Sequence, residues 1–109
     1  MTVNEQKAYN LIGIAKKAGK VIGGTDMVAE KIREKKNAVK AVFISCDASA
    51  NSVKRITNTA SFYGVPAMQV NIEKAMLGKI TGSAGERSVI GVTDEGLAKA
   101  IISRLENEN

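Results

Sequence analysis

The hydrophobic residues of the chain recur with two different periods, and these predict alternating helices and strands. Steps of three and four residues are typical of amphipathic helices, whereas short continuous apolar runs are typical of strands buried on both faces. By these criteria we predict helices over 4–17, 25–36, 53–63, 73–77 and 94–105, and strands over 20–22, 39–46, 67–70 and 88–93.

This alternation predicts the α/β class, with helices on both faces of a sheet. The runs 39–46 and 88–93 are the most continuously apolar, so they should be central strands. With 109 residues, 44% of them hydrophobic, the chain is long enough for one domain over 1–109 with a real core, and too short for two. The tail from Glu106 should fray.

Glycine and polar residues predict where the elements start and stop. Gly19 and Gly78 should end the helices before them, and Thr25 should cap the helix that follows it. Asp47 and Asp94 each follow a predicted strand, where paired carboxylates could do acid–base chemistry or hold a metal. A role as helix caps is favoured for both.

The composition narrows the chemistry. The chain has no histidine, which removes the commonest general base and metal ligand, and its single cysteine, Cys46, excludes an internal disulfide. Cys46 should be a small buried hydrophobe at the end of its strand. Four aromatic residues and no tryptophan offer no broad platform for base stacking. We expect no catalytic residues, metal or cofactor.

No apolar run approaches the roughly 18–20 residues that span a bilayer. Acidic Glu5 lies where a signal peptide would be basic. We therefore expect a cytoplasmic protein without membrane association.

Basic residues concentrate in one segment. Residues 16–40 carry eight basic and three acidic side chains, a net charge equal to the +5 of the whole chain. Such a distribution favours one basic face that binds nucleic acid, although a solvated helix that keeps the protein soluble is the alternative. The lysines expected to neutralise phosphates, and so to make affinity fall steeply with salt, are Lys16, Lys20, Lys31 and Lys36.

A glycine-rich turn precedes the helix inside this basic segment. Gly23 and Gly24 allow positive φ and close approach of a ligand, and the helix start at Thr25 offers free N–H groups to a phosphate. A second glycine-containing stretch, 82–87, is either a plain surface connection or a loop that approaches an RNA backbone or an extruded base.

Several signatures in order resemble one known family. They are Gly19-Lys20-Val21-Ile22 followed by Gly24-Thr25-Asp26, the strand exit 42–47, Tyr63-Gly64-Val65-Pro66, Leu77-Gly78 and the glycine loop before 89–92. Over about residues 5–105 the chain resembles the ribosomal protein L7Ae superfamily, and most closely its small bacterial YlxQ-type members. The resemblance implies a three-layer α-β-α sandwich with a mixed four-stranded central sheet, no catalytic activity, and binding to kink-turn RNA, in which sheared G·A pairs beside a bulge bend the duplex.

The resemblance also assigns positions. The family motif is glycine, any residue, Asn, Glu, two residues, then Lys, which falls here on Gly24, Asp26, Met27 and Glu30. An ionised Glu30 cannot donate to guanine O6 as lysine would, whereas Asp26 can accept from guanine N1–H and N2–H. We expect altered base readout, with RNA shape and backbone contacts carrying more of the affinity.

The family's second contact packs a loop against the bulged nucleotide. It falls on 83–86, where the branched apolar residues usual in the family are missing. Together, the residues predicted to bind RNA are Lys16, Lys20, Gly23, Gly24, Thr25, Asp26, Met27, Glu30, Lys31, Lys36, Ser83, Ala84, Gly85, Glu86 and Arg87.

Two functions follow as hypotheses. The first is a monomeric, ribosome-associated protein that binds structured RNA, such as ribosomal RNA or another RNA with a kink-turn or internal loop. The alternative is a protein-interaction module in ribosome assembly or translation, with little intrinsic RNA specificity, in which the basic helix meets an acidic ribosomal or assembly protein.

Overall fold

Helices and strands alternate along the computed structural model, which describes residues 1–106. The helices are α1 (Val3–Lys17), α2 (Thr25–Glu34), α3 (Ala50–Phe62), α4 (Lys74–Ile80) and α5 (Glu95–Glu106), and the strands are β1 (Val21–Gly23), β2 (Ala41–Ile44), β3 (Ala67–Gln69) and β4 (Val89–Val92). Every predicted element is present, with ends shifted by a few residues. Glu106 closes α5, and the rest of the tail predicted to fray, 107–109, lies outside the described residues.

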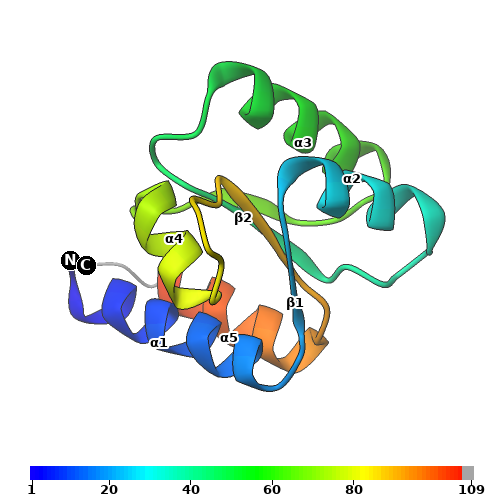
Figure 1. The fold of residues 1–109 in the computed structure, drawn as a ribbon. Coiled ribbons are helices and arrows are strands. Elements are labelled where there is room, and N and C mark those ends of the chain that lie inside the picture. The colour runs from blue at the N-terminus through cyan, green and yellow to red at the C-terminus, as the bar shows by residue number, and fades with distance from the viewer. Residues whose placement is uncertain (107–109) are drawn as a thin grey trace.

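The strands form one mixed sheet in the order β1-β4-β2-β3. β4 pairs antiparallel with both β1 and β2, whereas β2 and β3 are parallel. β2 and β4 are the central strands, as predicted. Helices α1, α4 and α5 cover one face and α2 and α3 cover the other (Figure 1), which confirms the three-layer α-β-α sandwich.

The sheet divides the hydrophobic core in two, because successive side chains of a strand point to opposite faces. In β2, Ala41 and Phe43 pack toward α1 and α5, whereas Val42 and Ile44 pack toward α2 and α3. All four are buried, as is all of β4. Burying one large aliphatic or aromatic side chain contributes about 1.5–3 kcal/mol, so these two strands anchor both layers of helices.

Cys46 corrects one prediction. It is exposed, because β2 ends at Ile44 and the chain then leaves the sheet toward α3. The Cys46 N–H still donates to the Ile72 carbonyl, at 3.0 Å, so its backbone is fixed while its side chain faces solvent.

Both carboxylates at the strand exits cap helices. Asp94 accepts from the Leu97 N–H at 2.9 Å at the start of α5, as predicted. Asp47 accepts from the Lys74 N–H at 2.8 Å and so caps α4, which lies much further along the chain. That backbone N–H holds the pKa of Asp47 below its ordinary value, which favours an ionised cap. Within residues 1–106, no three His, Cys, Asp or Glu side chains gather as metal ligands would.

Gly78 corrects another prediction, because it lies inside α4 and does not end it. The helix continues to Ile80, and the Thr81 hydroxyl then donates to the Leu77 carbonyl at 2.8 Å. A Cβ atom at Gly78 would overlap the carbonyl oxygen of Gly85, so glycine lets the 82–87 loop lie directly against α4. The Ser83 N–H also donates to the Gly78 carbonyl, at 2.8 Å.

No helix within the described residues combines the length and the apolar character that crossing a membrane requires.

Replacing Gly78 by alanine should lower the free energy of unfolding by about 1–3 kcal/mol, because the added methyl group forces the 82–87 backbone away from α4. Urea unfolding followed by circular dichroism measures the loss. The matched control is Gly85→Ala, since a Cβ there meets no atom within 4 Å. It should change the free energy by less than about 0.5 kcal/mol. Equal losses for both variants would contradict the proposed contact.

Candidate nucleic-acid interface

A hollow lies where the starts of α2 and α3 meet the end of the 82–87 loop. It is lined by residues 23–27 with Glu30 and Arg87, all predicted from the sequence, and by Asn51, Ser52 and Arg55 of α3, which sequence reasoning did not assign to the site. We call it the α2-start hollow. It brings three separate parts of the chain to one end of the sheet.

The first turn of α2 has no side-chain cap. Gly24, with φ of +101°, is the N-cap residue, and Thr25 is the first residue of the helix, so the prediction that Thr25 caps it is wrong. Gly24 is held in place from both sides, because its N–H donates to Val89 at 2.9 Å and its carbonyl accepts from Val28 at 3.0 Å. A helix start without a side-chain cap attracts an anion through its N–H groups and its dipole.

The guanidinium group of Arg87 lies against the turn between β1 and α2. A Cβ at Gly23 would lie 3.1 Å from Arg87 Nε, and one at Gly24 would lie 3.1 Å from Arg87 Nη1. The Arg87 backbone is fixed separately, since its N–H donates to the Lys74 carbonyl at 3.0 Å. The two glycines therefore give Arg87 room beside the free end of α2.

An ion pair crosses the hollow between Asp26 of α2 and Arg55 of α3. Both side chains are exposed, so the pair contributes little to stability and mainly sets the position of the two groups. Asn51 and Arg55 are spaced i, i+4 on α3, which places them on the same helix face. That spacing was the available sequence signal, but nothing local indicated that this face meets α2.

The charge of the hollow differs from the predicted basic face. Arg55 and Arg87 stand against the carboxylates of Asp26 and Glu30, while the side chain of Met27 is 57% exposed. The lining is thus electrically balanced, with the positive end of α2 added to it.

The four predicted phosphate-binding lysines are not gathered at the hollow. Lys16 lies near Gly82, at the far end of the 82–87 loop from Arg87. The carbonyl of Lys20 accepts from Thr93, which places it at the opposite end of β1 from Gly24. Lys36 follows the other end of α2 and lines a different cavity, and Lys31 lines neither. These lysines therefore do not surround the glycine turn before α2, because residues 16–40 run through both ends of the sheet.

Residues 83–86 lie beside the hollow and do not line it. The Gly85 N–H donates to the Ser83 hydroxyl at 3.2 Å, and Glu86 pairs with Lys74 at 3.8 Å. Ala84, Gly85 and Glu86 are exposed. The loop is thus tied to α4 and presents its small residues to solvent.

Comparison with known proteins gives consistent matches. A sequence profile of the ribosomal protein L7Ae/L30e/S12e/Gadd45 family matches residues 6–102. The chain is 41% identical over 97 residues to the RNA-binding protein YlxQ of Enterococcus faecium, covering 88% of each chain. It is 38% identical over 98 residues to the RNA-binding protein YlxQ of Bacillus subtilis, covering 90% of this chain and 94% of that one.

Solved structures are similar to the chain as well. A Bacillus halodurans protein of unknown function matches with a TM-score of 0.84 and 28% identity, over 93% of this chain and 98% of that one. The Giardia lamblia 15.5kD RNA binding protein matches with a TM-score of 0.73 and 14% identity, over 97% of this chain and 88% of that one. The second likeness shows the fold alone.

Replacing Gly24 by alanine should lower the free energy of unfolding by about 1–3 kcal/mol, because its positive φ strains any residue with a Cβ. Gly23→Ala is the matched control, since a Cβ there meets only the flexible end of Arg87. It should cost less than about 0.5 kcal/mol yet shift the Arg87 Nε–H signal in NMR spectra. An unchanged Arg87 signal in Gly23→Ala would show that the guanidinium does not lie on the turn.

Proposed function

Since the chain belongs to the ribosomal protein L7Ae/L30e/S12e/Gadd45 family, we propose that it is a non-enzymatic RNA-binding protein that docks a kink-turn or an internal loop at the α2-start hollow. One observation carries the choice of site: the uncapped start of α2 is flanked by the guanidinium groups of Arg55 and Arg87. The relatives from E. faecium and B. subtilis, both named as RNA-binding proteins, support the class of ligand.

The start of α2 binds a phosphate in this proposal. Its N–H groups and dipole favour an anion, and Arg87 adds a planar cation with several donors next to it. Contacts of this kind position the RNA without reading its sequence. The glycines at 23 and 24 let the RNA backbone approach the turn closely.

Asp26 and Glu30 read base edges. A carboxylate accepts several hydrogen bonds, so Asp26 can accept from guanine N1–H and N2–H while Arg55 holds it in place. Glu30 accepts as well, whereas the lysine of the family motif would donate. The hollow therefore favours amino and imino groups of bases beside Asp26 and Glu30, and it disfavours guanine O6 beside Glu30.

An unstacked base has a place beside these groups. Single-stranded and bulged bases stack on arginine guanidinium planes, and an apolar side chain beside such a plane can cover the rest of the base. The exposed side chain of Met27 and the guanidinium groups of Arg55 and Arg87 provide such surfaces around one hollow. The aliphatic loop contact usual in the family is then replaced by contacts from α2 and α3.

We further propose that the RNA is ribosomal RNA or another RNA with a kink-turn, bound in the cytoplasm by the monomeric protein. Ribosomal and assembly proteins are further candidate partners. Family membership supports an RNA partner.

The proposal predicts a preference for bent RNA that survives salt. Purified protein is titrated against a kink-turn RNA and a straight duplex of the same length, at low and near-physiological salt. At the higher salt, the protein should bind the kink-turn at least about tenfold more tightly than the straight duplex. The reason is that the hollow recognises RNA shape and base edges through a lining whose charges balance, so its selectivity depends little on charge. Equal affinities that vanish together would contradict specific binding and favour the alternative of a protein-interaction module.

Two substitutions locate the site. Asp26→Ala should reduce the preference for the kink-turn, and Arg55→Ala should weaken kink-turn binding by on the order of tenfold, since it removes a guanidinium from the hollow and releases Asp26. Lys54→Ala is the matched control, because it removes the same charge from the next residue of α3, outside the hollow. If Lys54→Ala and Arg55→Ala weakened both RNAs equally, the RNA would not enter the hollow.

A further inference from the structure

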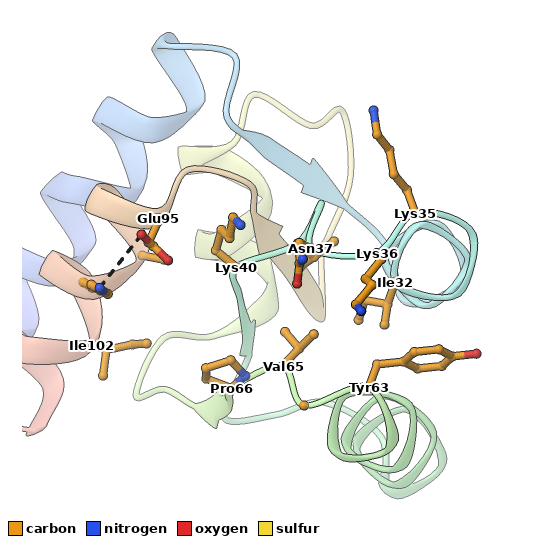
Figure 2. Close-up of a pocket in the computed structure, with 14 residues that line it drawn as sticks. Ile32, Lys35, Lys36, Asn37, Lys40, Tyr63, Val65, Pro66, Glu95 and Ile102 are labelled. Atoms are coloured by element: carbon orange, nitrogen blue, oxygen red, sulfur yellow. Dashed lines mark ion pairs between the residues drawn. The ribbon is translucent and has the colours of Figure 1, made fainter.

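A second cavity lies at the other end of α2. Its volume is about 290 Å³, and it is bordered by the end of α2, residues 35–40, residues 63–66 and the first turns of α5. Figure 2 shows Ile32, Val65 and Ile102 reaching it from three of these segments. We call it the α2–α5 cavity.

The bottom of this cavity is aliphatic. Ile32, Val39 and Ala98 line it and are almost completely buried, while Pro66 and Ile102 complete its walls. These side chains carry no hydrogen-bonding groups. The bottom of the cavity thus offers a base neither hydrogen bonds to its edges nor an arginine or aromatic plane to stack on, so it suits an apolar side chain better than a base.

The rim is strongly basic. Lys35, Lys36, Lys40 and Lys99 line the cavity against one carboxylate, that of Glu95. Glu95 is paired with Lys99 at 3.9 Å (Figure 2). Within residues 1–106 the other three lysines form no ion pair. Three of the eight basic residues of 16–40 thus lie at this rim, away from the α2-start hollow.

Two exposed aromatic rings adjoin the cavity. Phe62 is 81% exposed and Tyr63, which lines the rim, is 46% exposed. Their rings meet edge to face with centroids 5.0 Å apart. Tyr63 follows Phe62, the last residue of α3, at the point where the chain turns. Exposed aromatic residues beside a pocket are typical of protein–protein interfaces.

We propose that the α2–α5 cavity binds an acidic peptide segment of a partner protein. One apolar side chain of the segment enters the cavity, and neighbouring carboxylates pair with Lys35, Lys36 and Lys40. The cavity and the α2-start hollow lie at opposite ends of α2, so the peptide and an RNA can be bound together. This inference does not rest on the proposed RNA binding.

The test uses a labelled synthetic peptide with one leucine between glutamates. Its binding to the full chain is followed by fluorescence anisotropy, and NMR signals of Ile32, Val65 and Ile102 report its place. The peptide should bind with a Kd on the order of 10–500 μM, since one anchor and a few charge pairs support only modest affinity. A peptide with serine in place of the leucine should bind at least about fivefold more weakly.

Variants separate this site from a general basic surface. Lys36→Glu should weaken binding of the leucine peptide by about tenfold, because the substitution replaces an attraction between opposite charges by a repulsion at the rim. Tyr63→Ala should weaken it by about threefold or more through loss of the aromatic wall. Lys7→Glu, an exposed lysine of α1 that does not line the cavity, is the control and should change affinity by less than about twofold.

Three results would overturn the proposal. Equal binding of the leucine and serine peptides would mean attraction by charge alone. Peptide-induced shifts outside the cavity would place the contact elsewhere. Displacement of the peptide by a short single-stranded RNA, with the same shifts at Ile32 and Ile102, would assign the cavity to nucleic acid. Leucine-dependent binding that is lost in Lys36→Glu and retained in Lys7→Glu supports it.

Discussion

The burial of β2 and β4 on both faces is the constraint on which the rest of the structure depends. Side chains of both strands are buried on both sides of the sheet, so helices must cover both faces. The connections between strands and helices are thereby confined to the two ends of the sheet. The α2-start hollow is formed by connections at one end, and the α2–α5 cavity lies at the other. Both candidate sites are consequences of how the central strands are covered.

Close packing at glycine residues and hydrogen bonds to the backbone position the residues of the hollow. Glycine at 78 lets the 82–87 loop lie on α4, and the loop delivers Arg87 to the turn at Gly23 and Gly24. Asp47, at the end of β2, fixes the start of α4 through the Lys74 N–H. The Lys74 carbonyl in turn accepts from the Arg87 N–H. A guanidinium group near the start of α2 is therefore placed by hydrogen bonds that begin at the carboxylate of Asp47, just beyond the central strand β2.

The features that could be predicted from the sequence are those that depend on the local pattern of residues. Each element has a hydrophobic period of its own, so all helices and strands, the central position of β2 and β4, and the glycine turn before α2 could be found in order. The Thr25 cap is a local error, but several others concern contacts between segments distant in the chain. Exposure of Cys46 depends on where β2 leaves the sheet, and Gly78 is explained only by Gly85. Arg55 belongs to the hollow only because α3 packs beside α2, a juxtaposition no local pattern contains.

The same reasoning explains why the net charge of residues 16–40 did not indicate where their lysines lie. A sum over a segment predicts one face only if the segment stays on one side of the molecule, and α2 instead carries its lysine-rich end away from its glycine turn. The α2-start hollow is left with balanced side-chain charges and the dipole of α2, while the basic rim surrounds an aliphatic cavity.

A balanced site releases few counterions on binding, so its selectivity must come from geometry. A basic rim around an apolar pocket attracts acidic partners and holds them by the side chain that fills the pocket. The distribution of charge thus assigns different recognition chemistry to the two ends of one helix.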